Sequence, residues 1–255
     1  MAIGIDTPLL RVEHVCKRFG GVQVFDDVSF AVAPGEVLGV IGPNGAGKTT
    51  LINVTSGQLA PSAGRVLLQE RDVTRLPMHA RARLGLVRSF QQTKTFKQAS
   101  VRENIERALS FSGGLHTAAA DHIDSLLDRF DLRQHLARQS DKLAYGQQKL
   151  LGLLLTCATS PRILLLDEPA AGLEGSERTR IDDFVRSAIE HFGCGVLIVE
   201  HDMDLIKRLC TRALVLDGGR LVAEGAPHEV LTRPEVLAAY LGTAHSEADE
   251  EAAAC

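Results

Sequence analysis

The feature that most constrains this chain is a phosphate-binding pattern, G-x-x-x-x-G-K-[ST], at Gly42-Pro43-Asn44-Gly45-Ala46-Gly47-Lys48-Thr49. A polyphosphate needs several backbone N–H groups that point inward, and glycines allow the backbone to fold that tightly around it. Before this segment, residues 36–41 are a short apolar run typical of a buried strand, and after it residues 50–54 continue as a helix. The pattern therefore predicts a strand, a phosphate loop and a helix that together bind a nucleotide.

The residues of this loop suit different parts of a nucleoside triphosphate. The helix that follows presents the positive end of its dipole to the phosphates. Lys48 can reach the β- and γ-phosphates, and the hydroxyl of Thr49 can hold Mg²⁺. Thr50 is predicted to complete the nucleotide-binding segment. The alternative, a glycine-rich surface turn, does not explain the strand and helix patterns on both sides of the loop.

Composition limits the class of protein. The chain has 255 residues, of which 45% are hydrophobic and 24% charged, enough for one large domain or a domain with a lobe. The formal net charge of −4 gives no electrostatic reason to expect nucleic acid as the main partner. No apolar run approaches the roughly 20 residues that span a bilayer, and no secretory signal is visible at the start. The five scattered cysteines are interpreted as reduced, mostly buried thiols.

Two further apolar runs, residues 163–166 and 196–199, end in polar side chains that suit phosphate chemistry. Asp167 after the first run suits the Mg²⁺ shell, and Glu168 suits polarising the attacking water. His201 after the second run can donate a hydrogen bond to a γ-phosphate. In an α/β sheet the ligand lies at the carboxyl ends of the strands, where the phosphate loop also opens. Each group alone could simply cap a strand, but their shared placement favours a catalytic role.

The order of these motifs resembles the ATP-binding subunit of ABC transporters, over almost the whole chain, from about Leu9 to Gly242. The segment Leu143-Ala144-Tyr145-Gly146-Gln147-Gln148 stands where that family has its LSGGQ-like signature, about one helix before Asp167. The resemblance implies that Ala144, Tyr145, Gly146 and Gln147 contact the ATP held by the opposite subunit of a dimer.

The same resemblance assigns three further positions. Gln91 is implied to be the lid glutamine, which contacts Mg²⁺, takes part in catalysis and faces the membrane subunit. Phe19 is implied to stack on the adenine, and residues 171–174 match the segment that crosses the dimer interface. A groove near Phe90, Phe96 and Val101 is expected to receive a helix of the membrane subunit.

The chain departs from the family pattern at two places. Ala144 replaces the signature serine, and Tyr145 replaces the glycine that follows it, so the segment has one hydroxyl fewer for the γ-phosphate. The backbone N–H groups at the start of the helix remain, so we expect anion binding to survive. Glu174 stands where relatives usually have Asp or Asn, which leaves its interface role open.

The resemblance implies an α/β fold, with a P-loop NTPase-type core sheet, an antiparallel β subdomain and an inserted helical lobe. We expect an ATPase domain over 9–242, with a core of about 9–89 and 161–226, a helical lobe of about 91–160 and closing helices of about 227–242. Residues 243–255 form an expected disordered acidic tail. Local patterns predict strands at 9–15, 28–32, 37–41, 65–68, 163–166, 196–199 and 213–216, helices at 101–110, 118–130 and 149–158, a hairpin at 217–220, and helix starts at Pro227 and Pro234.

Several segments together look like the longer ATPase subunit of the branched-chain (hydrophobic) amino acid uptake system: the signature, residues 168–173, residues 199–203 and the closing residues 234–242. This implies ATP and Mg²⁺ as cofactors, a second ABC ATPase subunit as hetero- or homodimer partner, integral membrane permease subunits, and indirectly a periplasmic binding protein. The chain would lie peripherally on the cytoplasmic side of the inner membrane. Alternatives are a related importer for urea, amides or aromatic acids, an ABC exporter, and a soluble ABC ATPase acting on DNA or ribosomes.

Overall fold

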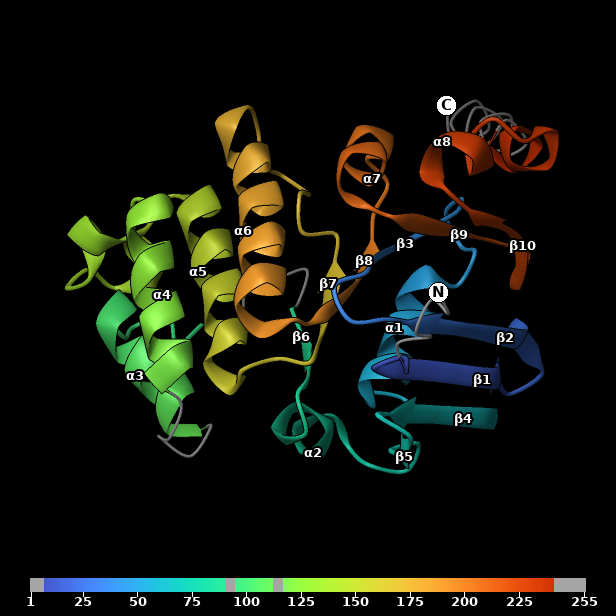
Figure 1. The fold of residues 1–255 in the computed structure, drawn as a ribbon, viewed down its shortest axis with the longest axis horizontal. Helices are drawn as coiled ribbons and strands as arrows, with labels where there is room; N and C mark the ends of the chain where they lie inside the picture. Colours follow the sequence, from blue (N-terminus) through green and yellow to red (C-terminus); the bar gives the residue numbers. More distant parts are fainter. Residues whose placement is uncertain (1–6, 90–94, 112–116, 241–255) are drawn as a thin grey trace, which may run out of the picture.

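Two β-sheets and a group of helices make up the chain in its computed structural model, which describes residues 7–89, 95–111 and 117–240 (Figure 1). The larger sheet has six strands in the order β10-β9-β3-β8-β7-β6, and the smaller has four in the order β2-β1-β4-β5. The strands of the larger sheet are β3 (Val37–Ile41), β6 (Leu86–Arg88), β7 (Ile163–Asp167), β8 (Gly195–Val199), β9 (Arg212–Asp217) and β10 (Arg220–Gly225).

The central strands of the larger sheet run parallel. β3 pairs with β8 and β9, and β7 pairs with β8 and β6, all in parallel register, whereas β10 is antiparallel to β9. Every residue of β3, β7 and β8 is buried, which explains why these strands are nearly continuous apolar runs in the sequence. Their carboxyl ends therefore meet at one edge of the sheet, with the end of β8 between those of β3 and β7.

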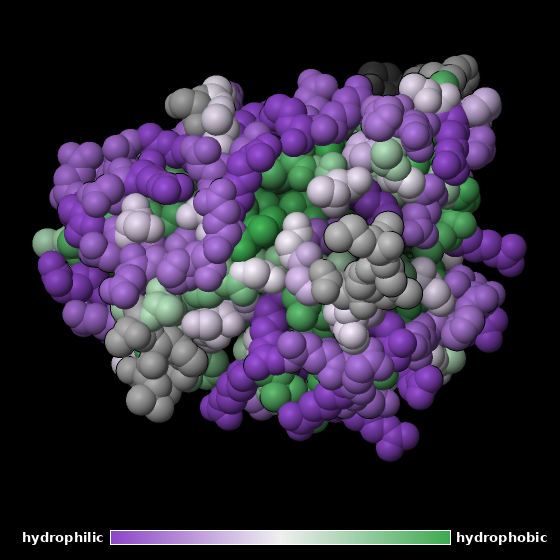
Figure 2. All heavy atoms as spheres, viewed as in Figure 1, coloured by the Kyte–Doolittle hydropathy of each residue, from purple (hydrophilic) through white to green (hydrophobic). Residues whose placement is uncertain are grey.

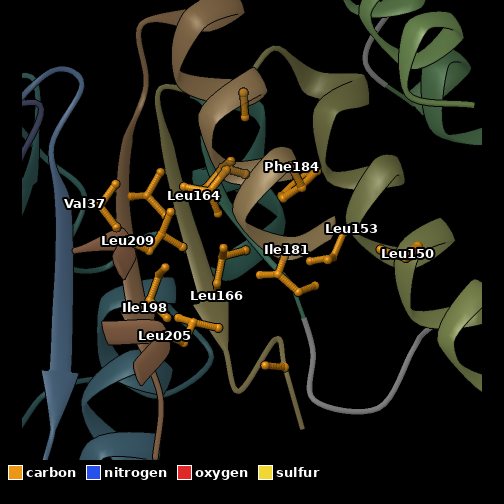
Figure 3. Packing of buried hydrophobic residues seen from close by; sticks show 14 of the residues in the cluster. Val37, Leu150, Leu153, Leu164, Leu166, Ile181, Phe184, Ile198, Leu205 and Leu209 are labelled. Atoms are coloured by element: carbon orange, nitrogen blue, oxygen red, sulfur yellow. The ribbon is translucent and has the colours of Figure 1, made fainter. Parts of the chain in front are cut away.

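Buried apolar residues form two clusters, one on each face of the larger sheet. Figure 2 shows apolar residues that gather near the middle of one face of the molecule, with mostly hydrophilic residues around them. Alternate residues of β7 point to opposite faces: Leu164 and Leu166 pack with Ile181 and Phe184 of the helical side (Figure 3), and Leu165 packs in the other cluster. Burial of both faces holds the central strands rigidly.

The smaller sheet is antiparallel, as the resemblance implies. Its second strand begins earlier than predicted: the adjacent Asp26 and Asp27 interrupt the apolar pattern, but residues 22–27 still pair with β1 through register shifts. The strands are β1 (Leu10–Phe19), β2 (Val22–Val32), β4 (Ala63–Leu68) and β5 (Arg71–Asp72).

Helices account for most of the chain between β6 and β7. The predicted helices at 101–110 and 118–130 are confirmed as α3 (Val101–Phe111) and α4 (Thr117–Arg129), which lie beside α5 in Figure 1. The local patterns left the long helix α6 unassigned. The remaining helices are α1 (Lys48–Ser56), α2 (Met78–Arg83), α5 (Tyr145–Thr156), α6 (Ser176–Phe192), α7 (Met203–Leu209), α8 (Pro227–Val230) and the 3₁₀ turns η1 (Arg133–His135), η2 (Ser140–Lys142) and η3 (Cys157–Thr159).

The turn and proline predictions at the C-terminal end are confirmed. Gly218 and Gly219 connect β9 to β10 and both have positive φ, as a tight hairpin requires. Pro227 lies in the first turn of α8, and residues 234–240 are helical from Pro234 onward. The predicted acidic tail, 243–255, lies outside the described residues.

The sequence predicts no membrane-spanning segment and reduced, mostly buried cysteines. None of the helices found there is both long and apolar enough to cross a bilayer. The cysteines of this part of the chain are free thiols, and Cys157, Cys194 and Cys210 are buried.

Phe184 offers a test of the core on the helical side of the sheet. It is fully buried, so Phe184→Ala should lower the free energy of unfolding by about 3–5 kcal/mol through lost burial and a residual cavity. Val22 is 69% exposed, and Val22→Ala should change that free energy by no more than about 0.5 kcal/mol. Urea denaturation followed by circular dichroism measures both, and equal effects of the two changes would contradict the assigned packing.

Candidate nucleotide-binding and hydrolysis site

The carboxyl edge of the larger sheet brings together the residues that the motifs predicted. The phosphate loop follows β3, Asp167 ends β7 with Glu168 directly after it, and His201 comes two residues after the end of β8. Since β8 lies between β3 and β7, His201 stands between the loop and the two carboxylates along this edge. Segments far apart in the sequence thus form one site.

The phosphate loop has a backbone that requires glycine. A Cβ on Gly42 would lie 2.0 Å from the Leu216 carbonyl oxygen, and Gly47 has φ of +98°. Gly47 also precedes α1, and among the described residues no side chain caps the first turn of that helix and no acidic residue lies in it. The free N–H groups and the positive end of the α1 dipole are therefore available to an anion.

Lys48 is the cation of this loop. Its side chain is buried, and Nζ donates hydrogen bonds to the carbonyl oxygens of Gly42 at 2.7 Å and Pro43 at 2.8 Å. Burial lowers the pKa of Lys48, while the negative charge of Glu168 acts in the opposite direction. The ammonium group is thus held inside the loop, near the edge that carries Glu168.

Glu168 has a strained backbone and a histidine partner. Its φ of 47° is unusual for a residue other than glycine, and such strain is characteristic of functional sites. The Glu168 N–H donates to the Val199 carbonyl at 2.9 Å, which ties the turn to the end of β8. His201 Nε2 lies 3.1 Å from Glu168 Oε1, so the two side chains predicted to act on water and the γ-phosphate are in hydrogen-bond contact.

Two buried ionisable residues that the sequence analysis missed hold this turn in place. Lys149 of α5 donates to the carbonyl oxygens of Glu168, at 3.0 Å, and Ala171, and burial lowers the pKa of its ammonium group. Glu200 accepts hydrogen bonds from the N–H groups of Ala170, at 2.8 Å, and His201, at 3.1 Å, and burial raises the pKa of its carboxyl group. The apolar run that follows Lys149 directly was the available signal, because a lysine drawn into the interior by such a run needs partners for its ammonium group.

Arg88 is a further residue that the sequence analysis missed. It ends β6, and its Nη2 lies 2.7 Å from Asp167 Oδ2 in an ion pair whose side chains are only 5% and 4% exposed. No local pattern reveals this pair, because its members are 79 residues apart in sequence.

The signature segment forms the first turn of α5, which begins at Tyr145 and not at residue 149 as predicted. The Ala144 N–H donates to Gln147 Oε1 at 3.3 Å, and this contact extends the helix toward its N-terminus. The methyl group of Ala144 cannot accept a hydrogen bond, so among the described residues no side chain caps the first turn. No side chain of the described residues therefore accepts a hydrogen bond from the N–H groups of residues 145–147, although the Glu177 carboxylate lies beside this turn.

Gly146 and Tyr145, both in the first turn of α5, make close contacts with other segments. A Cβ on Gly146 would lie 2.0 Å from Glu177 Oε1, so the Glu177 carboxylate lies directly against the start of α5. Tyr145 is 58% exposed, and a Cβ on Gly172 would lie 2.8 Å from its ring. The tyrosine that departs from the family pattern thus packs on the segment expected to cross a dimer interface.

The remaining predicted residues are less closely tied to this edge. Phe19, 48% exposed, ends β1 beneath the Lys17 ammonium group, 4.7 Å from its ring centroid. Phe96 is 60% exposed, whereas Val101 is fully buried among the helices, so a groove near these residues would be lined by Phe96 and not by Val101. Gln91 and Phe90 lie outside the described residues.

These residues fit a magnesium nucleotide. The uncapped start of α1 and the buried Lys48 ammonium group are complementary to a polyphosphate. The hydroxyl of Thr49, which is exposed, and the carboxylate of Asp167 supply the hard oxygen ligands that Mg²⁺ prefers, and this ion commonly takes few protein ligands beside phosphates. The geometry defines a P-loop nucleotide-binding protein.

Comparison with known proteins narrows this class. The profile of the family described as "ABC transporter" matches residues 25–171, and that of the "Branched-chain amino acid ATP-binding cassette transporter" family matches residues 220–246. The chain belongs to the ABC transporter family of ATP-binding proteins, and its fold is that of an ABC ATPase.

Relatives of this chain span nearly its whole length. The high-affinity branched-chain amino acid transport ATP-binding protein LivG of Salmonella typhimurium is 38% identical, covering 93% of this chain and 99% of the relative. The lipopolysaccharide export system ATP-binding protein LptB of Acidithiobacillus ferridurans is 35% identical, covering 92% and 97%. The structure of the ADP conformation of MJ1267, an ATP-binding cassette of an ABC transporter, is 30% identical with a TM-score of 0.81, covering 92% of this chain and 99% of that one.

Lys48 provides a direct test of nucleotide binding. Lys48→Ala removes a charge-assisted contact worth roughly 1.5–3 kcal/mol, so affinity for ATP should fall about tenfold or more. Isothermal titration calorimetry measures the change, with the exposed Lys207→Ala as the control that should bind as the parent does. Unchanged ATP affinity in Lys48→Ala would show that the loop does not hold the phosphates.

Proposed function

We propose that this chain is the ATP-binding and hydrolysing subunit that powers an ABC importer for branched-chain or other hydrophobic amino acids. The observation that carries the ATPase part is the convergence of the phosphate loop, Asp167, Glu168 and His201 at one sheet edge. The substrate class is supported by the branched-chain profile at residues 220–246 and by the similarity to LivG.

In the proposed reaction each residue has a separate task. Lys48 and the N–H groups of the phosphate loop bind and neutralise the β- and γ-phosphates. Glu168 accepts a proton from the attacking water, and His201, in contact with Glu168, donates a hydrogen bond to the γ-phosphate. Phe19 stacks on the adenine. The strained, doubly anchored backbone of Glu168 keeps its carboxylate in one orientation.

Mg²⁺ would be held by Thr49 and Asp167, with Gln91 as a further ligand, and would neutralise charge on the phosphates. Asp167 is suited to this task because its carboxylate is already held in place by Arg88. The remaining contribution of the chain is to keep this oxygen set at the mouth of the phosphate loop.

A dimer in which two ATPase subunits share their sites is part of the proposal. The N–H groups at the N-terminus of α5, which have no side-chain acceptor among the described residues, would contact the γ-phosphate held by the opposite subunit, through residues 144–147, once the neighbouring Glu177 carboxylate turns away. Because the Tyr145 ring packs against Gly172, binding of the γ-phosphate at the start of α5 would also affect the segment at residues 171–174. The opposite subunit is a second copy of this chain or a similar ATPase.

The proposed membrane partners are two permease subunits, fed by a periplasmic binding protein, with this chain on the cytoplasmic side of the inner membrane. The helices between β6 and β7 would form the lobe, about residues 91–160, that transmits the motion of the dimer to the permeases. Phe96 and the cation of Arg107, 4.7 Å from its ring centroid, offer an exposed apolar and basic surface for such a contact.

A second candidate function is export. It is favoured by the similarity to LptB, an ATP-binding protein of an export system, over nearly the whole chain. The ATPase chemistry proposed here is the same in both directions, and the membrane subunits set direction and substrate.

Glu168→Gln tests the catalytic role and the shared site together. The amide keeps the shape of the side chain but cannot accept the proton of water, so turnover should drop by about 10² or more while ATP still binds. Because ATP is then not consumed, the variant should accumulate as an ATP-dependent dimer, visible by light scattering with and without Mg-ATP.

Two results would count against this assignment. Hydrolysis at the parental rate would remove Glu168 from the reaction. A variant that stays monomeric with ATP, even when the partner ATPase is present, would contradict the shared site.

Phe96→Lys tests the contact with the permeases. A second cation beside Arg107 should repel rather than pack, so ATP-driven leucine uptake into vesicles carrying the whole transporter should fall about tenfold or more. ATP affinity of the isolated chain should stay unchanged. Val222→Lys, on a 39% exposed side chain of β10 at the opposite end of the molecule, is the matched control (Figure 1).

The outcomes separate the docking surface from the substrate class. Full uptake by Phe96→Lys would exclude this docking surface. Parental vesicles that take up urea but not leucine, or that export, would overturn the proposed substrate class or direction.

A further inference from the structure

Arg88 makes polar contacts in two directions from one buried guanidinium group. Its Nη2 pairs with Asp167 Oδ2 at 2.7 Å, at the carboxyl edge of the larger sheet, where β6 and β7 lie side by side (Figure 1). Both side chains are almost fully buried, so water screens this ion pair little.

The second terminal nitrogen of Arg88, Nη1, contacts α1, the helix that follows the phosphate loop. Nη1 donates to Asn53 Oδ1 at 2.5 Å and to Ser56 Oγ at 3.3 Å, both in α1, and to Gln58 Oε1 at 2.9 Å just beyond it. A planar guanidinium group can hold donors toward both sides at fixed angles, whereas an ammonium group acts as a single point of charge. Arg88 thus bridges α1 and the end of β7.

The bridge connects the two proposed protein ligands of Mg²⁺. Thr49 lies in the first turn of α1, and Asn53 lies one turn further along the same helix. Asp167 is the other end of the bridge. A change in the position of Arg88 would therefore change the separation of the Thr49 hydroxyl and the Asp167 carboxylate.

We propose that Arg88 is a positioning residue that sets the placement of Asp167 relative to Thr49 and so determines the affinity for the divalent cation that accompanies the nucleotide. This inference rests on the proposed function, in which Mg²⁺ and ATP bind at this edge. The opposite possibility is that Arg88 merely masks the charge of Asp167. The two differ in sign: loss of a positioning group weakens cation binding, and loss of a masking charge strengthens it.

The experiment measures the cation separately from turnover. Binding of Mn²⁺, as a paramagnetic substitute for Mg²⁺, is followed by electron paramagnetic resonance on the full chain saturated with ADP. ADP affinity in EDTA is measured in parallel by calorimetry. Arg88→Met should weaken Mn²⁺ binding about tenfold or more, the usual scale for residues that orient metal ligands, and leave ADP affinity in EDTA unchanged.

Two milder variants keep the test decisive if Arg88→Met does not fold. Arg88→Lys keeps the charge beside Asp167 but cannot hold both sides, so Mn²⁺ binding should weaken to an intermediate degree. Asn53→Ala does not alter either member of the Arg88–Asp167 pair and removes the shortest contact to α1, so it should also weaken Mn²⁺ binding.

Arg81 supplies the matched control. It is 1% exposed and also touches the end of α1, but it donates to backbone carbonyls, including those of Val54 at 3.0 Å and Thr55 at 2.7 Å. Arg81→Lys should therefore leave Mn²⁺ affinity unchanged even if it lowers stability. A double-mutant cycle of Arg88→Lys with Asp167→Asn should be non-additive, because Arg88 acts through Asp167.

The results separate this inference from the proposed function. Unchanged or tighter Mn²⁺ binding in the Arg88 variants would overturn the positioning role, and so would an equal loss in Arg81→Lys. A parental chain that binds no Mn²⁺ with ADP would overturn the proposed magnesium nucleotide site, and this inference with it.

Discussion

The parallel pairing of β3, β8 and β7 is the constraint on which the rest of the site depends. The register aligns Val40 of β3 with Val199 of β8, and Val199 with Asp167 of β7, so the three strands end at nearly the same level. Because both faces of these strands are buried, a slip of one residue would exchange side chains between the two clusters and disrupt the packing of both. The phosphate loop, Glu168 and His201 are therefore presented together on a rigid edge, as a reaction that depends on positioning requires.

Buried charges complete this rigid frame. Burying a charged side chain without a partner is unfavourable. Each of the buried charged residues here has a hydrogen-bonded or ionic partner: Lys149, Glu200, Arg88 and Asp167. Their partners are largely the backbone of the turn after β7 and side chains at the C-terminal end of α1. The burial of these groups consequently stabilises the unusual backbone of Glu168 and links α1 to β7, rather than adding a separate source of stability.

The proposed hydrolysis site and the proposed contacts with the permeases involve different parts of the molecule. Relatives that cover nearly the whole chain are named for amino acid transport and for lipopolysaccharide export. In the proposed function, direction and substrate would depend on surfaces outside this edge, such as the exposed side of the helices that carries Phe96 and Arg107. Similarity of fold and site is thus a stronger basis for the reaction than for the cargo.

The sequence by itself determined the elements whose signals are local: the phosphate loop, the apolar strands β3, β7 and β8, the amphipathic helices α3 and α4, and the glycine hairpin. It also placed Asp167, Glu168 and His201 at strand ends. Features that depend on contacts between distant segments were decided only by the tertiary structure. The spacing of apolar residues shows which side chains are buried, but it does not show which residues they contact. Four features depend on such contacts: the Arg88–Asp167 pair, the burial of Val101, the early start of α5 and the positive φ of Glu168. The first half of β2, whose apolar pattern is interrupted by two aspartates, formed a strand for the same reason, since its pairing with β1 outweighed its weak local pattern.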